Sequence, residues 1–296
     1  MRIAVTGREG QVVRSLVERA ERRSDVTIIP LGRPEFDLGH PEGIAAAIVT
    51  VRPDIVVSAA AYTAVDQAED EPDLARAMNE TGAGAVAAAA AACGAPVIHL
   101  STDYVFAGDL YRPYVETDPT GPHGVYGRTK LAGETAVAAA NPRHVILRTA
   151  WVYSPFGKNF VRTMLSLAAD RDVVRVVADQ LGNPTSALDI ADGILEIAPQ
   201  LLGQVPAEHF GVFHLAGTGS SHWAGFAAAI FEASAAIGGP SARVEAITTA
   251  DFPTKARRPA NSRLSTDRLN HVFGWRAPKW QASCAAVVQR LIGSAG

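Results

Sequence analysis

Short apolar runs alternate with longer helical patterns through the first half of the chain. Five of these runs have the length and continuous hydrophobicity of strands that are buried on both faces of a parallel sheet. They span residues 2–6, 26–31, 54–59, 96–101 and 144–149. Helical patterns fill the intervals, at residues 11–22, 42–51, 72–93 and 126–140. This alternation predicts an α/β fold with a Rossmann-type, doubly wound parallel sheet.

The pattern is less regular after about residue 150. Strand-like runs lie at residues 173–178 and 211–216, and helices are expected at 158–170, 187–200 and 222–237. Ser221 precedes the last of these helices and is its expected N-cap. Two long loops that contain several prolines, residues 101–124 and 248–266, are of the kind that is usually functional or disordered.

No linker separates two independent domains. We therefore expect residues 1–150, with parts of 173–220, to form the Rossmann-type domain. Residues 151–296 would mainly form a smaller C-terminal substrate-binding lobe, interleaved with the first domain and closing over the ends of its sheet.

Composition narrows the class of protein. Of the 296 residues 48% are hydrophobic and the formal net charge is −3, without a basic block, which fits a globular protein and argues against a nucleic-acid binder. Cys93 and Cys284 are too few for a disulfide scaffold or a four-cysteine zinc site, and the eight histidines have no metal-ligand spacing. The most apolar stretch, residues 83–95, is shorter than the roughly 20 residues of a membrane span. We expect a cytoplasmic protein with no membrane partner and no metal site.

A glycine-containing turn follows the first strand and opens a helix, in the sequence VTGREGQVV. Gly7 suits the sharp turn, and Gly10 lets the backbone approach a pyrophosphate at the N-terminus of the helix that begins near Gln11. Val13 stands where such motifs often have a third glycine for close packing, so we expect it to push the helix out slightly. The turn predicts a dinucleotide site; an ordinary strand-to-helix turn is the alternative.

The end of the second strand bears on the choice of coenzyme. NAD-binding folds often carry an acidic residue there, whereas an arginine suits the extra phosphate of NADP. This chain has Gly32 and Arg33 in the sequence PLGRPE, with no carboxylate at the strand end itself. We therefore predict NADPH, with NADH possible; the alternative is that Arg33 is only a solvated loop charge.

The stretch VYGRTKLAGE places Tyr126 and Lys130 four residues apart, on one face of a predicted helix. A nearby ammonium and an oxidised nicotinamide would favour the phenolate and lower the tyrosine pKa from about 10. The pair could then protonate a ketone oxygen as hydride reaches its carbon. Ser101 and Thr102 add hydroxyls at the carboxyl end of the fourth strand, where open α/β sheets bind ligands. The alternatives are that Tyr126 and Lys130 form an ordinary pair on a helix surface, and that the hydroxyls of Ser101 and Thr102 simply end a strand.

With these elements assembled, the chain resembles an extended short-chain dehydrogenase/reductase, and more specifically the dTDP-4-dehydrorhamnose reductase family. The resemblance runs from residue 1 to about 290. It rests on the blocks NETGAGAVAAAA, IHLSTDYVFAGD, YVETDPTGPHGVYGRTKLAGE, LRTAWVYSPFGKNFVRTML, DQLGNPTSALDIAD and RRPANSRLST. It implies hydride transfer from NAD(P)H to C4 of dTDP-4-dehydro-6-deoxy-L-mannose, which gives dTDP-L-rhamnose, a precursor of cell-surface polysaccharide.

The resemblance also implies roles for individual residues. Tyr126 would be the proton donor, Lys130 its electrostatic partner and Thr102 a residue that tunes the substrate hydrogen bond. The coenzyme would contact Gly7, Gly10, Gln11, Val12, Arg33, Asp37, Leu38, Ala59, Ala60, Ala61, Tyr62, Thr63, Tyr126 and Lys130. The nucleotide sugar would contact Thr102, Asp103, Tyr104, Tyr126, Trp151, Arg258, Asn261 and Arg263. Forked arginine donors suit a diphosphate.

Three departures from the family pattern matter. Val13 replaces a glycine, and Gly32-Arg33 replaces an acidic residue that is common in relatives. Some relatives dimerise around a magnesium ion held by carboxylates, one of them on the first helix. Arg14 and Ser15 occupy that stretch here, so we expect a monomer or a weak homodimer.

Two other kinds of function stay open at this point. One is another nucleotide-sugar reductase or a 4-epimerase of the same fold; a dehydratase is disfavoured because Asp103 has no neighbouring glutamate. The other is a non-catalytic, NADP-binding regulatory subunit that resembles the β subunit of methionine adenosyltransferase.

Overall fold

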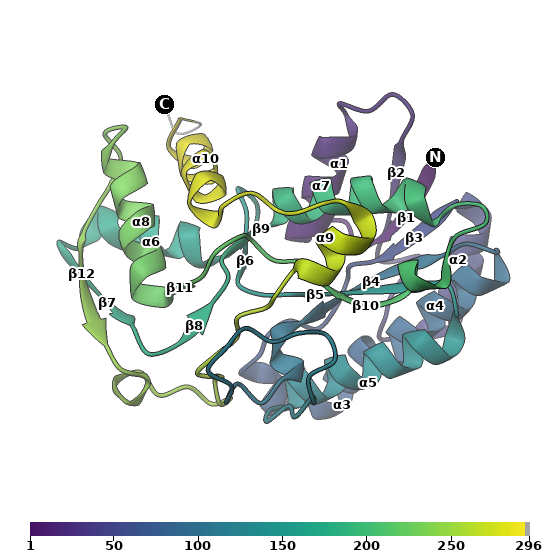
Figure 1. The fold of residues 1–296 in the computed structure, drawn as a ribbon, viewed down its shortest axis with the longest axis horizontal. Coiled ribbons are helices and arrows are strands. Elements are labelled where there is room, and N and C mark those ends of the chain that lie inside the picture. Colours follow the sequence, from purple (N-terminus) through teal and green to yellow (C-terminus); the bar gives the residue numbers. More distant parts are fainter. Residues whose placement is uncertain (294–296) are drawn as a thin grey trace.

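Six parallel strands form the centre of the larger half of the molecule in the computed structural model, which describes residues 1–293 (Figure 1). Their order across the sheet is β10-β5-β4-β3-β1-β2, so the chain starts one strand from an edge, adds β2 at that edge and then builds across the sheet to β10 at the other. The strands are β1 (Arg2–Thr6), β2 (Thr27–Leu31), β3 (Ile55–Ser58), β4 (Val97–Thr102), β5 (His144–Thr149) and β10 (Gly211–His214). The predicted doubly wound parallel sheet is confirmed.

Alternating side chains of the strands enter two separate cores. Ile3 and Val5 of β1 pack under α1 (Gln11–Ala20) and α7 (Ala187–Ile197), whereas Ala4 packs on the other face under α2 (Ile44–Val51) and α4 (Ala83–Ala92). Figure 1 shows α1 and α7 on one side of the sheet, and α4 and α5 (Val125–Ala140) on the other. Both faces are buried, which is why the strands are continuously apolar.

The helix predicted over residues 72–93 is interrupted. It consists of α3 (Pro72–Arg76), a π-helical turn (Ala77–Gly82) and α4. A side chain at Gly82 would come within 2.6 Å of the Leu38 carbonyl oxygen, so only glycine permits this close approach. The π-helical turn carries Asn79, which is 1% exposed and hydrogen bonds to two other segments. Single π turns of this kind often occur at functional sites.

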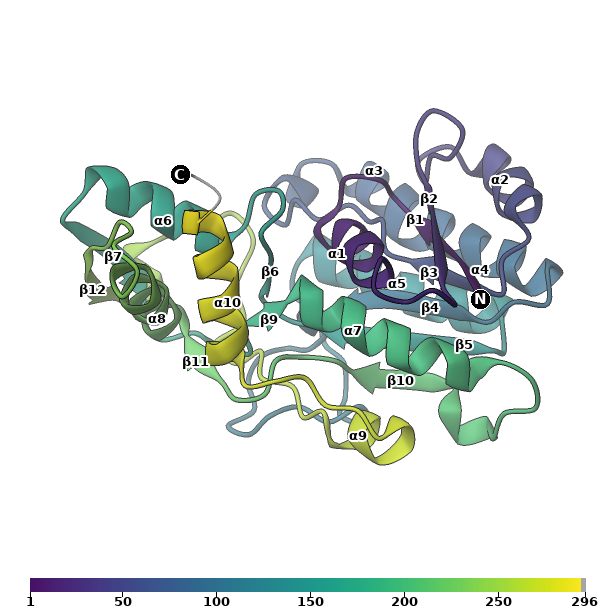
Figure 2. The ribbon, with the colours of Figure 1, turned by 90° about the horizontal axis from the view of Figure 1, so that it is seen from above.

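The smaller lobe lies beside the carboxyl ends of the sheet strands (Figure 2). Its core is formed between α6 (Phe160–Asp170), α8 (Trp223–Ala235), α10 (Trp280–Gly293) and a parallel pair of strands. That pair is β7 (Val173–Val177) and β12 (Arg243–Ile247). Of the region 173–220, β10 and α7 therefore lie with the large sheet, whereas β7 belongs to the lobe.

Several elements of the second half escaped prediction. The strands are too short for a periodic signal: β6 (Val152–Tyr153), β8 (Leu181–Gly182), β9 (Thr185–Ser186) and β11 (Ser221–His222). The helices α9 (Asp267–Phe273) and α10, and strand β12, were also missed. The prediction of Ser221 as an N-cap was wrong. His222 is the N-cap of α8, and its Nδ1 accepts the Gly225 N–H at 2.9 Å, because Ser221 pairs with Gly182 in β11.

The first long loop is held in place by one tyrosine. Tyr114 is 1% exposed and stacks on Phe106 at 4.2 Å between ring centroids. Its hydroxyl oxygen accepts the N–H groups of Gly108 and Asp109, at 2.8 and 2.9 Å. These contacts replace the backbone hydrogen bonds that regular secondary structure would supply.

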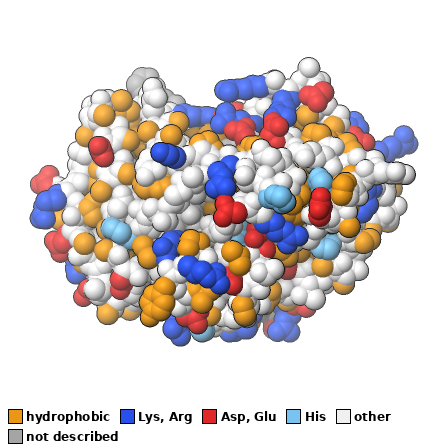
Figure 3. Space-filling model, viewed as in Figure 1, with side chains coloured by type: hydrophobic (Ala, Val, Ile, Leu, Met, Phe, Trp, Pro, Cys, Tyr) orange, Lys and Arg blue, Asp and Glu red, His pale blue; other side chains and the backbone are white. Residues whose placement is uncertain are grey.

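The surface shows no dominance of one charge on the face seen in Figure 3, where basic and acidic side chains are interspersed. Within residues 1–293, no helix has the length and apolar character needed to cross a membrane.

Candidate active site

Tyr126 and Lys130 lie one turn apart on α5, and both reach the end of β4. The Tyr126 phenol lies beside the Thr102 side chain. The Lys130 ammonium donates to the Leu100 carbonyl oxygen at 2.7 Å, and Lys130 is 2% exposed. The structure thus brings together the three residues predicted to be catalytic, at the sheet edge where open α/β sheets bind ligands.

Glycine allows the start of α5 to lie this close to β4. A side chain at Gly127 would come within 2.3 Å of the Tyr104 carbonyl oxygen. The helix has no side-chain N-cap; instead, the Val125 N–H donates to Glu69 Oε1 at 2.7 Å. Helix α5 is therefore anchored at its first turn by a carboxylate from the segment after β3.

Burial is the main influence on the pKa values of Tyr126 and Lys130. It raises the pKa of Tyr126, an effect that the neighbouring Thr102 side chain only partly offsets. It also lowers the pKa of Lys130 to about 8, against the opposing influence of Glu134. The expected lowering of the tyrosine pKa is not found in the chain by itself, because desolvation disfavours the phenolate. Tyr126 is therefore a protonated acid at neutral pH.

The predicted coenzyme segment Ala59–Thr63 is held by two polar side chains. Thr6 Oγ1 accepts the N–H groups of Ala59 and Ala60 at 3.0 and 2.9 Å. Asn79 Oδ1 accepts the Tyr62 N–H at 2.8 Å, and its amide donates to the Tyr62 carbonyl and to Thr129 Oγ1, both at 3.1 Å. Asn79 was not predicted as a site residue, because the sequence shows only an amide inside a helical pattern and its burial is known from the structure alone. It fixes this segment against α5.

The glycine turn has the features that a pyrophosphate needs. Gly7 has a φ of +100°, which favours glycine, and Gly10 precedes α1 without a side-chain cap. The first N–H groups of α1, from Gln11 onward, are thus available for an anion. Val13 is 2% exposed and lies in the core, with its Cγ2 3.3 Å from where a Gly7 side chain would begin. The residues present fit a dinucleotide phosphate.

The end of β2 brings two arginines together. Arg8, which was not predicted, donates to the Arg33 carbonyl at 3.0 Å and pairs with Glu35 at 3.0 Å. Its side chain lies against Gly32, where an added Cβ would be 2.8 Å from Arg8 Cγ. The carboxylate of Glu35 is thus engaged by one arginine, and Arg33 is exposed.

Two further predicted coenzyme residues lie on the loop after β2. Asp37 Oδ1 accepts the Gly39 N–H at 2.9 Å within its own turn. Leu38 is 3% exposed, and its side chain packs in the core with α4. Only the backbone of Leu38 is therefore placed to meet a ligand.

Trp151 sits in a stack of rings at the border of the lobe. Its φ of +47° is unusual for a residue with a side chain. The indole stacks on Trp223 with centroids 3.6 Å apart and planes at 10°. An added Cβ at Gly182 would come within 2.3 Å of the Trp151 ring, so glycine is required there. Trp223, which sequence reasoning missed, fixes the orientation of Trp151.

Arg258 is connected to the candidate catalytic residue Tyr126 through Tyr104. Its guanidinium pairs with Asp66 at 2.5 Å and donates to the Tyr104 hydroxyl at 3.2 Å. The Tyr104 ring packs edge-on against Tyr126, with centroids 5.5 Å apart. The loop 248–266 thereby contacts the segment that follows β3, close to the candidate catalytic residues.

Asn261 and Arg263, which the resemblance implies as contacts of the nucleotide sugar, form hydrogen bonds with the first long loop. The Asn261 amide donates to the carbonyls of Leu110 and Arg112, and its Oδ1 accepts Arg263 Nε at 2.8 Å. Arg263 also donates to the Tyr111 carbonyl at 2.5 Å. Both side chains therefore tie the two long loops together.

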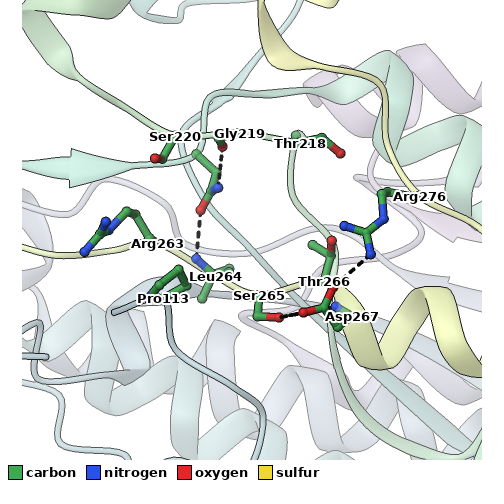
Figure 4. A pocket seen from close by; sticks show the side chains of 12 residues that line it. Pro113, Thr218, Gly219, Ser220, Arg263, Leu264, Ser265, Thr266, Asp267 and Arg276 are labelled. Carbon is green, nitrogen blue, oxygen red and sulfur yellow. Dashed lines mark hydrogen bonds and ion pairs between the residues drawn. The ribbon is translucent and has the colours of Figure 1, made fainter. Parts of the chain in front are cut away.

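A cavity of about 240 Å³ beside Arg263 is lined by Leu264, Ser265, Asp267, Arg276 and the segment 217–220 (Figure 4). None of Thr102, Tyr126 and Lys130 lines it. Among residues 1–293, no cluster of three or more His, Cys, Asp or Glu side chains could hold a metal ion.

Asp103 is buried at the end of β4. It is 3% exposed, accepts the Thr102 hydroxyl at 2.9 Å, and its Oδ2 has no hydrogen-bond partner. Burial raises the pKa of this carboxyl from 3.8 to about 6, because the hydrogen bonds it accepts offset only part of the desolvation. An incompletely paired, buried carboxyl beside Tyr126 and Thr102 is a suitable acceptor for substrate hydroxyls.

We predict that Asp103→Asn stabilises the protein at neutral pH. Between about pH 4 and 6 the folded chain holds a proton that the unfolded chain has lost, so the stability of the wild type falls as pH rises through this window. The neutral amide avoids that loss, and the variant should be more stable by about 3 kcal/mol at pH 7 and equal below pH 4. Urea unfolding at several pH values measures this. The exposed Asp172→Asn is the control, and an Asp103→Asn gain that does not change with pH would contradict the prediction.

Comparison with known proteins assigns the chain to one group. The profile of the RmlD substrate binding domain family matches residues 1–292. The dTDP-4-dehydrorhamnose reductase of Sinorhizobium fredii is 53% identical over 292 residues, which cover 99% of this chain and 98% of that protein. The crystal structure of the dTDP-4-dehydrorhamnose reductase of Clostridium acetobutylicum matches with a TM-score of 0.91 and 35% identity, over 99% of this chain and all of that one. The Bacillus anthracis reductase, solved with NADP, matches with a TM-score of 0.89 and 33% identity, over 98% and 99% of the two chains.

Proposed function

This chain belongs to the dTDP-4-dehydrorhamnose reductase family, and we propose that it reduces the C4 ketone of dTDP-4-dehydro-6-deoxy-L-mannose with NADPH, using Tyr126 as the acid. Its activity is that of an NAD(P)H-dependent reductase in dTDP-rhamnose biosynthesis, as the sequence predicted. The observation that carries the assignment of the acid is the position of the Tyr126 phenol beside Thr102 at the end of β4, one helical turn from the buried Lys130 ammonium.

Each residue of the site has a separate role in the proposed reduction. When NAD(P)H is bound, it supplies the hydride that reaches C4 of the sugar. Tyr126 gives its phenolic proton to the ketone oxygen, so that the product is a neutral alcohol. Thr102, which lies beside that phenol, orients it. The Lys130 ammonium, one turn along α5, stabilises the phenolate that remains.

Binding uses the groups around this centre. The uncapped start of α1 holds the coenzyme pyrophosphate, and the segment 59–63 meets the nicotinamide half. Asp103 and Trp151 contact the sugar, and Arg258 is placed to exchange Asp66 for the substrate diphosphate. Asn261 and Arg263 shape this site by holding the loops that frame it.

We predict that Arg33→Ala raises the KM for NADPH about tenfold and leaves the KM for NADH unchanged. Arg8 and Arg33 outnumber Glu35 at the end of β2, so the site favours the additional 2′-phosphate of NADPH. Steady-state kinetics with both coenzymes test this, with the exposed Arg171→Ala as the control. A wild type that prefers NADH would overturn the coenzyme assignment.

A coupled assay tests the function itself. dTDP-glucose is converted by the upstream dehydratase and epimerase, and consumption of NADPH is followed after this protein is added. Formation of dTDP-L-rhamnose is the expected result. Absence of oxidation would favour the regulatory-subunit alternative, and coenzyme that stays bound through purification would favour an epimerase.

A monomer or weak homodimer is part of the same proposal. The carboxylates on the outer face of α1 and α7 are engaged by arginines of this chain: Glu18 by Arg290, Asp192 by Arg19 and Glu196 by Arg23. These ion pairs leave the carboxylates poorly suited to share a cation with a second copy.

A further inference from the structure

A buried histidine lies directly behind the candidate catalytic lysine. His99 is on β4 and is 1% exposed. Its Nε2 lies 3.3 Å from Lys130 Nζ, and its Nδ1 lies 3.1 Å from the Ser58 hydroxyl oxygen on the neighbouring strand β3. Lys130, His99 and Ser58 therefore form a polar line through the apolar interior of the sheet.

The ammonium group of Lys130 has three N–H donors. One donates to the Leu100 carbonyl oxygen at 2.7 Å, and a second faces His99 Nε2. Both acceptors belong to β4, so this strand engages two of the three N–H groups of Lys130. One N–H remains for a ligand, and the nitrogen cannot rotate freely.

Geometry also fixes the state of the imidazole. Lysine ammonium is only a donor, so Nε2 must carry a lone pair, and the ring proton must sit on Nδ1 and donate to Ser58. Burial and the neighbouring ammonium both lower the pKa of His99, which keeps the ring neutral. A protonated ring would instead repel Lys130.

We propose that His99 is a positioning residue of the reductase reaction, whose neutral Nε2 holds the Lys130 ammonium in place and keeps it charged beside Tyr126. This rests on the role proposed above for Lys130. His99 does not touch the reacting atoms; it acts by providing a fixed acceptor to a buried cation that would otherwise have only one.

Other charged groups around Lys130 leave this role to His99. Glu134 lies one turn further along α5 and favours the ammonium, but its oxygens are engaged by Arg148 of β5 and by Ser101. The Glu134–Arg148 pair is nearly neutral as a unit. Contact with the ammonium itself is therefore made by β4.

Two substitutions separate the two ends of the imidazole. His99→Gln can place an amide oxygen near the Nε2 position and so keep an acceptor for Lys130. His99→Asn reaches only the Nδ1 position, facing Ser58, and loses that acceptor. We expect His99→Asn to shift the alkaline limb of the kcat–pH profile down by about one pH unit, because the ammonium loses a hydrogen bond. His99→Gln should keep the wild-type limb.

Binding provides a readout that does not depend on turnover. NADPH affinity, measured by fluorescence titration from pH 6 to 10, should weaken at a lower pH in His99→Asn than in His99→Gln. The exposed His271→Gln serves as the control for loss of a histidine, and thermal unfolding verifies that each variant folds.

The outcomes distinguish the proposed role of His99 from the proposed reductase function. Equal alkaline limbs and equal binding profiles for His99→Asn, His99→Gln and wild type would overturn the role of His99. An inactive wild type, or a Tyr126→Phe variant that is fully active, would instead overturn the catalytic function on which it rests.

Discussion

Replacing Tyr126 by phenylalanine is expected to lower kcat about 10³-fold, which corresponds to about 4 kcal/mol of transition-state stabilisation. The variant keeps the ring that packs against Tyr104 at 5.5 Å and removes only the hydroxyl that lies beside Thr102. The ketone oxygen then gains negative charge during hydride transfer without an internal acid. Stopped-flow measurement of NADPH oxidation under single-turnover conditions isolates this step.

The controls distinguish an acid from a binding group. NADPH affinity in Tyr126→Phe should change less than about threefold, because the loss is confined to the transition state. Thr102→Val should lower kcat by only about tenfold, since it removes a hydroxyl that orients the phenol and not the proton itself. If Tyr126→Phe and wild type oxidise NADPH at the same rate, the proton comes from elsewhere and Tyr126 is not the catalytic acid.

Breaking the buried ion pair beneath α5 is expected to have the largest effect on stability. Glu134 and Arg148 are each 5% exposed. Arg148 donates to both carboxylate oxygens, at 2.9 and 2.6 Å, and Ser101 donates to one of them at 2.5 Å. Glu134→Leu leaves a buried guanidinium without its partner and should cost about 3–5 kcal/mol of unfolding free energy, measured by chemical denaturation.

A double-mutant cycle tests whether the cost comes from the unpaired charge. The variant Glu134→Leu, Arg148→Met should lose clearly less than the sum of the two single variants, because neither charge remains buried alone. Glu245→Leu breaks the exposed pair with Arg175 and should cost no more than about 1 kcal/mol. Additive losses in the cycle would show that packing, and not charge, determines the cost.

The stability of this region and its catalytic use are linked through α5. That helix carries Tyr126 and Lys130 on the face toward β4, and Glu134 one turn later joins it to β5. The ion pair thus holds the helix that carries Tyr126, the proposed acid. Asp103 shows the opposite relation, since its buried carboxyl lowers stability at neutral pH at a place where we propose that the substrate sugar binds.

The sequence by itself determined the large sheet, the glycine turn and the placement of Tyr126 and Lys130 on one helix face. Each of these has a local signature: continuous apolar runs for doubly buried strands, glycine before a helix, and a spacing of four on a helix. The family followed from blocks that can be read directly along the chain. These predictions needed no knowledge of which distant segments meet.

Only the tertiary structure decided the rest. The pairing of β7 with β12, the amide of Asn79 across the segment 59–63, and His99 behind Lys130 all join residues far apart in the chain. Such contacts leave no periodic trace, because the partner of a buried polar group is set by packing and not by its neighbours in sequence. Burial likewise reversed the expected direction of the Tyr126 pKa, since desolvation exists only once the fold has closed around the phenol.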